Sequence, residues 1–200
     1  MAEQEPAVQA DLVWTVPNML SGVRLLTIPV FAWLALGPQE DGLAALVLAL
    51  GGLTDYFDGI LARRWNQVTR LGQLLDPIAD RLSTLTVLVV FLIRGVVPLW
   101  FVALLVLRDA VLAIEMGRLK ARGITGLPVN YIGKAATFNL LLSFPLLLWG
   151  ADAQSAIEEL ARIAGWALAL WGTGLYLYSG VLYVRQTRDV LSQLPAPAAA

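Results

Sequence analysis

The chain has 200 residues, of which 58% are hydrophobic and only 14% charged, and its formal net charge is -1. A mean hydropathy of +0.70 excludes an ordinary soluble domain and favours a polytopic membrane protein. Cysteine and histidine are both absent, which excludes disulfides, thiol chemistry, imidazole bases and Cys/His zinc sites. Any proton transfer must therefore fall to Asp, Glu, Lys, Tyr or water.

Taken in chain order, the apolar runs predict an all-α fold with six transmembrane helices. Residues 1–11 are polar and acidic and are expected to be disordered, and a short interfacial segment follows them. The spans are expected at about 19–36, 42–62, 74–93, 97–117, 131–149 and 162–184. Each is close to the roughly 20 residues that cross hydrocarbon. The third is entered through Asp76-Pro77, where a proline in the first turn is tolerated. Residues 12–190 then form one membrane domain, and 191–200 form a tail without structure.

The basic residues predict which side of the membrane each connection faces, because Lys and Arg in short loops are retained in the cytoplasm. They gather in the second-to-third connection, in the fourth-to-fifth connection and after the last span: Arg63, Arg64, Arg70, Arg118, Lys120, Arg122, Lys134, Arg185 and Arg188. The opposite loops are mainly acidic, with Glu40, Asp41, Asp152, Glu158 and Glu159 against Arg94 and Arg162. We therefore expect a multi-pass protein of the cell membrane with both termini in the cytoplasm.

Four aspartates stand out at the predicted cytoplasmic ends of the second and third helices. Asp55 and Asp58 are spaced i,i+3, and Asp76 and Asp80 are spaced i,i+4, so each pair shares one helix face. Two such faces opposite each other would form a four-carboxylate cage, and these hard oxygen ligands suit Mg2+ or Mn2+. The pattern predicts a divalent-metal site. The competing interpretation is a solvated loop or an ion-pair network with the neighbouring arginines Arg63, Arg64, Arg70 and Arg81.

The whole stretch reads Asp55-x2-Asp58-Gly59-x2-Ala62-Arg63-x8-Gly72-x3-Asp76-x3-Asp80. It resembles, at every position, the signature of the CDP-alcohol phosphotransferases, also called CDP-alcohol phosphatidyltransferases. The resemblance implies six transmembrane helices, two bound Mg2+ or Mn2+ ions, a CDP-linked lipid such as CDP-diacylglycerol, and a homodimer. It also implies that Asp55, Asp58 and Asp76 bind metal, and that Asp80 is the general base with a secondary role at a metal.

Two further segments resemble the branch of phosphatidylglycerophosphate synthases and CDP-alcohol-type cardiolipin synthases. They are Pro17-Asn18-Met19-Leu20-Ser21-x2-Arg24 and Tyr131-Ile132-Gly133-Lys134-Ala135-Ala136-Thr137-Phe138. In an enzyme of this kind an alcohol attacks the lipid-side phosphorus of the donor and CMP leaves.

Several smaller features of the chain agree with nucleotide and acceptor binding. Gly59 and Ala62 would let a nucleotide approach the helix, Gly72 would let the second and third helices come close, and Arg63 suits the CDP phosphate. The candidates for an anionic acceptor headgroup are the cations Arg108, Arg118, Lys134 and Arg185. Mutual neutralisation with Asp109 also explains Arg108, and interfacial snorkelling also explains Arg118 and Lys134.

The sequence thus predicts an enzyme of phospholipid biosynthesis that transfers the phosphatidyl group of CDP-diacylglycerol to glycerol 3-phosphate or phosphatidylglycerol. It leaves the acceptor open, and a related enzyme with an acceptor such as inositol phosphate is an alternative. An intramembrane prenyltransferase fits less well, because those proteins generally have more helices and a different aspartate pattern. A cation transporter is disfavoured because the four aspartates gather at one membrane face rather than at the midplane. No nucleic-acid partner is expected.

Overall fold

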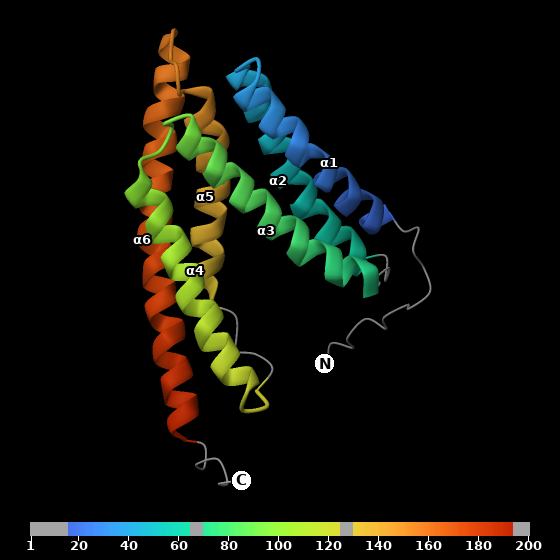
Figure 1. Ribbon diagram of the computed structural model, residues 1–200, viewed down its shortest axis with the longest axis vertical. Coiled ribbons are helices and arrows are strands. Elements are labelled where there is room, and N and C mark those ends of the chain that lie inside the picture. Colours follow the sequence, from blue (N-terminus) through green and yellow to red (C-terminus); the bar gives the residue numbers. More distant parts are fainter. Residues whose placement is uncertain (1–15, 65–69, 125–129, 194–200) are drawn as a thin grey trace. The chain divides into compact units, whose positions relative to one another are not determined.

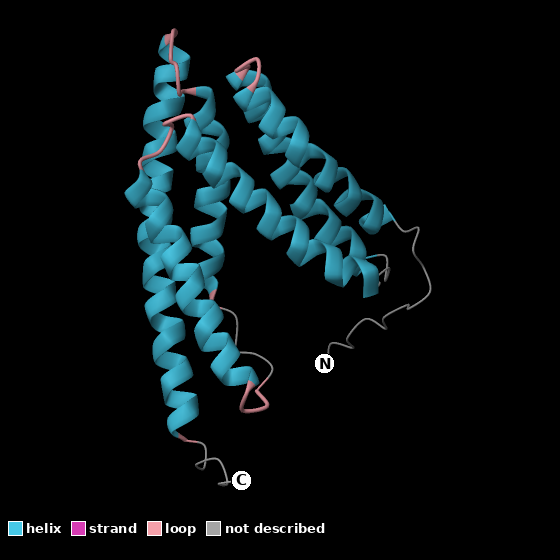
Figure 2. Cartoon of the chain, viewed as in Figure 1, coloured by secondary structure: helices cyan, strands magenta, loops and turns pink. Residues whose placement is uncertain are grey.

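The computed structural model describes residues 16–64, 70–124 and 130–193, without the side chains of 55–64, 70–77 and several positions before residue 25. These described residues form six α-helices and no strand (Figures 1 and 2). The helices are α1 (Val16–Leu36), α2 (Asp41–Arg64), α3 (Arg70–Ile93), α4 (Leu99–Lys120), α5 (Tyr131–Trp149) and α6 (Ala156–Ser192). The predicted all-α fold is confirmed, and α5 coincides with its predicted range. Residues 1–11 and 194–200, at the two predicted unstructured ends, lie outside the described residues.

Two helices of the described chain, α5 and α6, are long and apolar enough to cross a membrane by length and composition. Two shorter apolar stretches lie at Leu25–Leu36 in α1 and at Asp41–Thr54 in α2. This agrees with a membrane protein, whereas six spans remain a prediction.

The start of α3 differs from the prediction. The helix begins at Arg70 rather than at about 74, so Pro77 lies seven residues inside it and not in its first turn. The prediction was wrong because a proline removes only one i→i-4 hydrogen bond, and membrane helices compensate such a loss through their neighbours or by local adjustment. Helices α1 and α5 likewise continue through Pro29 and Pro145.

Helix α6 is much longer than predicted, with 37 residues instead of the range 162–184. Its start is set by a capping box, in which the Ser155 hydroxyl accepts a hydrogen bond from the Glu158 N–H at 3.3 Å. The Glu158 carboxylate in turn accepts from the N–H groups of Gln154 and Ser155 at 2.6 and 3.0 Å. At 1.5 Å per residue the helix is about 55 Å long, which exceeds a hydrocarbon core of about 30 Å. It also extends through Ser192, into the segment predicted as a tail.

The chain divides into two compact units, of which the first comprises Met1–Val96 and Phe144–Gly165. Within it, α1 packs against α2 and α3. The rings of Phe91 and Phe144 meet edge to face at 5.6 Å. Helix α3 ends in a Schellman motif, because Gly95 adopts a φ of +68° and the Val96 N–H reaches the Phe91 carbonyl at 2.9 Å.

A nearly buried arginine, Arg94, ties the helix ends of this first unit together. Its guanidinium donates two parallel hydrogen bonds to Asp41 at the start of α2, at 2.8 and 3.0 Å. It also donates to the Ala35 carbonyl at the end of α1, at 2.6 Å, and to Asp152 in the loop before α6, at 3.3 Å. The hydrogen bond to Asp41 raises the pKa of Arg94. The guanidinium therefore stays charged, and its stabilisation is fully present below the ordinary arginine pKa and lost only at pH above it.

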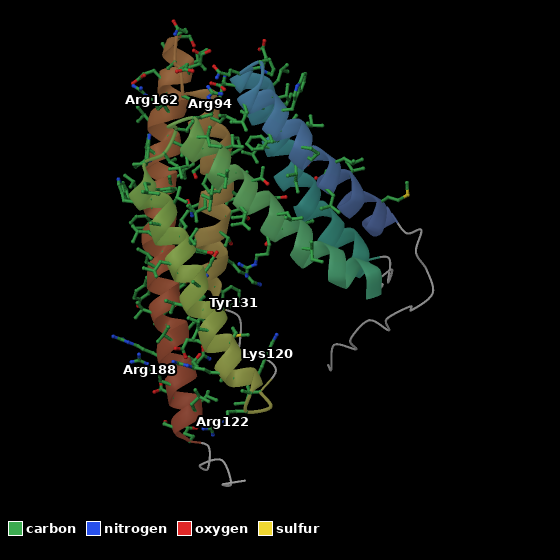
Figure 3. All side chains as sticks on the ribbon, in the orientation of Figure 1. Arg94, Lys120, Arg122, Tyr131, Arg162 and Arg188 are labelled. Carbon is green, nitrogen blue, oxygen red and sulfur yellow. The ribbon has the colours of Figure 1, made fainter. Side chains whose placement is uncertain are left out.

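The second unit comprises Val97–Ser143 and Trp166–Ala200. Helices α4 and α6 run parallel in it. The ring of Phe101, early in α4, meets that of Trp166 with centroids 5.9 Å apart, and Arg108, later in α4, contacts Ser179, which is also later in α6. Helix α5 is antiparallel to α6, since the Asn130 N–H at the start of α5 donates to the Tyr183 hydroxyl late in α6. The ends of α4 and α6 and the start of α5 therefore share one end of the unit, where Figure 3 labels Lys120, Arg122, Tyr131 and Arg188.

Candidate functional site

The predicted metal site falls on the ends of two helices. Asp55 and Asp58 lie near the C-terminal end of α2, which continues to Arg64, and Asp76 and Asp80 lie in the first half of α3. Because both segments are helical, the positions of each pair share one helix face. The side chains of Asp55, Asp58 and Asp76 lie outside the described part of the structure, as do the surroundings of the nucleotide-binding candidates Gly59, Ala62, Arg63 and Gly72.

Asp80 is the one member of the quartet whose side chain is described, and it is exposed. Its neighbour Ala79 is fully buried, with 0% exposure, so Asp80 lies on a different and accessible face of α3. Among the described side chains no group of three acidic residues could hold a metal ion. That observation leaves the predicted quartet untested, because three of its members are not described.

Arg108, a predicted acceptor-binding residue, is engaged within the second unit. Its side chain is only 13% exposed and lies over the ring of Tyr176, 3.8 Å from the centroid. It donates to the Tyr176 carbonyl at 3.3 Å, to the Ser179 hydroxyl at 3.0 Å and to Asp109 at 3.1 Å. The Tyr176 hydroxyl also donates to Asp109, at 2.6 Å. These contacts agree with the alternative that Arg108 is neutralised within the helix bundle. Its partners are Asp109, as that alternative named, and also Tyr176 and Ser179 of α6.

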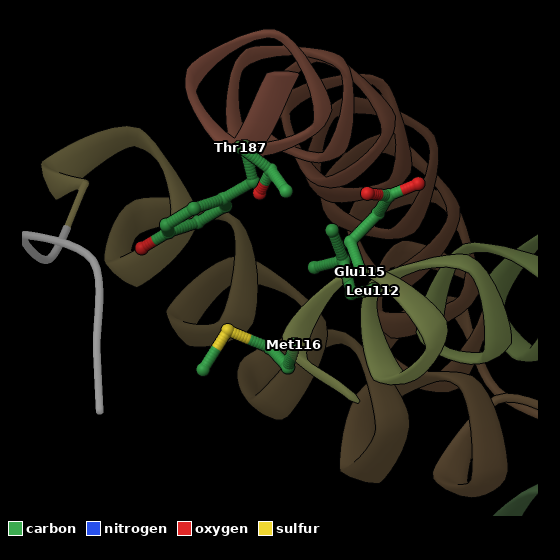
Figure 4. Close-up of a pocket in the computed structure, with 5 residues that line it drawn as sticks. Leu112, Glu115, Met116 and Thr187 are labelled. Carbon is green, nitrogen blue, oxygen red and sulfur yellow. The ribbon is translucent and has the colours of Figure 1, made fainter. Parts of the chain in front are cut away.

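Arg118 forms a salt bridge with Glu115, one turn earlier on α4. Its Nη1 atom lies 2.8 Å from Glu115 Oε1. The Glu115 side chain is 9% exposed and that of Arg118 is 62% exposed. Glu115 also lines a cavity of about 180 Å³ with residues of α4 and α6, namely Leu112, Met116, Tyr183 and Thr187 (Figure 4). Sequence reasoning assigned no role to Glu115. A glutamate within an apolar helix, three residues before an arginine, could have marked Glu115 as a candidate.

The other two acceptor candidates are exposed. The Lys134 ammonium lies 5.6 Å from the ring centroid of Tyr131, an exposed residue one turn earlier. Arg185 lies two residues from both Tyr183 and Thr187, which line the cavity, so helical geometry places it on a different face of α6. The described contacts thus connect Arg118 to the cavity only through its salt bridge with Glu115, whereas Arg108 lies ten residues earlier in α4, roughly 15 Å away along the helix axis.

Comparison with known proteins places these features in a family context. Residues 14–171 match the family described as CDP-alcohol phosphatidyltransferase. The chain is 53% identical, over 94% of its length and 89% of the relative's, to a protein of Streptomyces coelicolor named cardiolipin synthase (CMP-forming). It is 31% identical, over 90% of its length and 99% of the relative's, to the CDP-diacylglycerol–glycerol-3-phosphate 3-phosphatidyltransferase of Escherichia coli strain K12.

Proposed function

The chain belongs to the CDP-alcohol phosphatidyltransferase family, and we propose that it transfers the phosphatidyl group of CDP-diacylglycerol to phosphatidylglycerol, forming cardiolipin and CMP. One observation carries the choice of acceptor. Identity is 53% to the CMP-forming cardiolipin synthase but 31% to the enzyme that acts on glycerol 3-phosphate, although both alignments cover at least 90% of this chain. Release of CMP requires a cytidine diphosphate lipid as donor, which agrees with the aspartate signature.

In this proposal the aspartates near the end of α2 and in the first half of α3 hold divalent metal, Mg2+ or Mn2+, with Asp80 in a secondary role there. Asp55, Asp58 and Asp76 are the ligands, and their carboxylate oxygens are the donors that hard divalent cations prefer. Bound there, the metal would neutralise and orient the donor diphosphate. Gly59, Ala62, Arg63 and Gly72 would bind the nucleotide, with Arg63 contacting its phosphate.

Asp80 acts as the general base in the proposed reaction. It takes the proton of the acceptor hydroxyl while the hydroxyl oxygen attacks the lipid-side phosphorus, and the bond from that phosphorus to CMP breaks. Its exposed position on α3 agrees with access to a substrate. Arg118, Lys134, Arg185 and Arg108 remain the proposed cations for the acceptor phosphate, with Arg118 the best placed because its side chain is mostly exposed and pairs with Glu115, which lines a cavity.

We also propose six membrane spans with the aspartates at the cytoplasmic face, and a homodimer. The support for the orientation is the charge distribution, because the ends of α4 and α6 and the start of α5 are basic and share one end of the second unit. The homodimer rests on the family resemblance alone. Crosslinking of the purified protein would test it, and reactivity of single cysteines at the two helix ends would test the orientation.

The deciding experiment is a product assay. Purified protein is incubated with CDP-diacylglycerol, Mg2+ or Mn2+, and either phosphatidylglycerol or glycerol 3-phosphate, and the lipid product is identified by mass spectrometry. We expect cardiolipin and CMP from phosphatidylglycerol, and no turnover in excess EDTA. Formation of phosphatidylglycerophosphate alone would overturn the proposed acceptor, and full activity in EDTA would overturn the metal site.

Two substitutions separate the proposed roles of the aspartates. Asp76→Asn should abolish transfer and weaken metal binding, because it removes a charged ligand. Asp80→Asn should still bind CDP-diacylglycerol and metal but lose transfer by a factor on the order of 10^2 or more, because it removes a positioned base. If Asp80→Asn weakened metal binding as strongly as it slowed transfer, Asp80 would be a ligand rather than the base.

A further inference from the structure

The strongest unexplained feature among the described side chains is one oxygen of Glu115. Its Oε1 accepts a hydrogen bond from Arg118 at 2.8 Å, but its Oε2 is buried and has no hydrogen-bond partner among the described residues. Among the described residues, it is the only buried side-chain oxygen or nitrogen that has no hydrogen-bond partner. A buried polar atom without a partner is unfavourable, and nearly all such atoms in folded proteins have one, so Glu115 Oε2 points to a donor supplied by a ligand.

The cavity beside Glu115 has room for such a donor. Its volume of about 180 Å³ is far above the roughly 10–15 Å³ that a single water requires, so it admits a group of several atoms. Its walls are mainly apolar, from Leu112 and Met116 of α4 and the ring of Tyr183 of α6, and Thr187 lies one turn after Tyr183 on α6. The Tyr183 hydroxyl accepts the Asn130 N–H at 2.9 Å, which fixes that wall of the cavity. An apolar cavity with one carboxylate oxygen suits an amphiphilic ligand better than a freely soluble one.

The charged residues at this end of the second unit favour one kind of donor. Arg118 is 62% exposed beside Glu115, and Lys120, Arg122 and Arg188 lie at the same end of the second unit (Figure 3). This positive surrounding disfavours an ammonium group as the donor and favours a neutral hydroxyl attached to an anion. A phosphate diester with a hydroxyl-bearing headgroup satisfies both requirements, since the phosphate meets Arg118 and the hydroxyl meets Glu115.

We propose that the cavity between α4 and α6 binds the headgroup of a phosphatidylglycerol molecule, with Glu115 Oε2 accepting a hydrogen bond from a glycerol hydroxyl and Arg118 contacting the phosphate. This rests on the proposed function, and it identifies Glu115 as the residue that reads the hydroxyl groups of the acceptor lipid. The apolar wall at Leu112 and Met116 accepts the carbon chain on the lipid side of the phosphate. Glycerol 3-phosphate has no such chain, which is why the cavity favours the lipid.

The test measures binding separately from turnover. Full-length protein in detergent, without CDP-diacylglycerol, is titrated with phosphatidylglycerol, phosphatidic acid or glycerol 3-phosphate, and bound ligand is quantified by native mass spectrometry. In Glu115→Met the apparent Kd for phosphatidylglycerol should rise on the order of tenfold, because a hydrogen bond to a charged group is lost. The Kd for phosphatidic acid, which lacks the glycerol headgroup, should change less than twofold. Leu112→Trp, which fills the cavity, should weaken phosphatidylglycerol binding as well.

A stability measurement on the same variants separates a binding role from a structural one. Glu115→Met should keep or raise the thermal unfolding temperature, because it removes an unpaired buried oxygen and leaves only an exposed arginine without its partner. A matched control is Glu159→Met, since Glu159 and Arg162 form the same i,i+3 pair at 2.7 Å but with both side chains close to half exposed. The control should change neither lipid binding nor stability.

Three outcomes would overturn the proposal. Phosphatidylglycerol binding unchanged in both Glu115→Met and Leu112→Trp would mean that only water fills the cavity. Weaker binding of every lipid together with a lower unfolding temperature would make Glu115 a structural residue. Glycerol 3-phosphate binding as tightly as phosphatidylglycerol, and equally sensitive to Glu115→Met, would make the ligand a free phosphate. The product assay decides the acceptor of the reaction independently, so failure of the proposed function and failure of this site are distinguishable.

Discussion

Two nearly buried arginines, one in each unit, are neutralised by different kinds of partner. Arg94 follows the end of α3 and finds a helix-end carbonyl and two carboxylates, at Ala35, Asp41 and Asp152. Arg108 lies in the middle of α4, where it stacks on Tyr176 and finds one carboxylate and a hydroxyl. The side chains are 9% and 13% exposed, so neither can rely on water alone.

The difference follows from where each arginine lies along its helix. The last four carbonyls of a helix have no partner within it, so a terminal arginine such as Arg94 finds backbone acceptors ready. Carbonyls in the middle of a helix are already bonded, so Arg108 depends on the side chains of Asp109 and of α6. The Tyr176 carbonyl, which it also contacts, is at a long distance of 3.3 Å. The stability of the first unit should therefore depend on carboxylates, and that of the second on an aromatic ring.

The largest expected effect is that of Asp41→Ala. It removes both carboxylate oxygens that accept hydrogen bonds from Arg94. The nearly buried guanidinium is then left with the Ala35 carbonyl and with Asp152, whose side chain is 78% exposed. We expect a loss of about 3 kcal/mol in the free energy of unfolding, measured in mixed detergent and SDS micelles. The double variant Arg94→Met with Asp41→Ala should recover part of this loss, because no unpaired charge is left. A loss below about 1 kcal/mol in the single variant would show that water compensates Arg94.

An intermediate effect is expected at Tyr176. Tyr176→Phe keeps the ring over Arg108 and removes the hydroxyl that donates to Asp109, so it should cost about 1 kcal/mol. Tyr176→Leu also removes the cation–π contact and should cost about 2 kcal/mol. The same unfolding assay measures both variants. Equal losses would mean that the ring contributes nothing beyond its hydroxyl, and the contrast between the two arginines would fail.

The smallest effect is expected for Asp152→Asn. Asp152 is the exposed partner of Arg94, at a long distance of 3.3 Å, and exposed pairs of this kind contribute about 0–1 kcal/mol. We expect a change below about 0.5 kcal/mol in low salt, and less in high salt. A loss comparable with that of Asp41→Ala would show that the two carboxylates share the charge of Arg94 equally.

Local sequence signals predicted much of this fold. The apolar runs located all six helices, and the range predicted for α5 agrees with the observed one at both ends. Gly95 and Gly123, each with positive φ, end α3 and α4, as glycine does after many helices. The start of α6 was missed although Ser155 and Glu158 have the spacing of a capping box, because the prediction followed the apolar run and not the cap.

The sequence by itself determined the spacing of the aspartates and the family to which that spacing belongs, because both depend only on positions along the chain. It could not determine which helix faces meet. Helices α5 and α6 each contain an apolar stretch long enough to cross a membrane, and composition within such a stretch does not mark a buried side. Only the tertiary structure decided that Arg108 meets Tyr176 and Ser179, and that Glu115 is buried beside a cavity while Glu159, in the same kind of pair, stays partly exposed. The reason is that burial and partner choice depend on the neighbouring helix, whereas periodicity describes only one helix at a time.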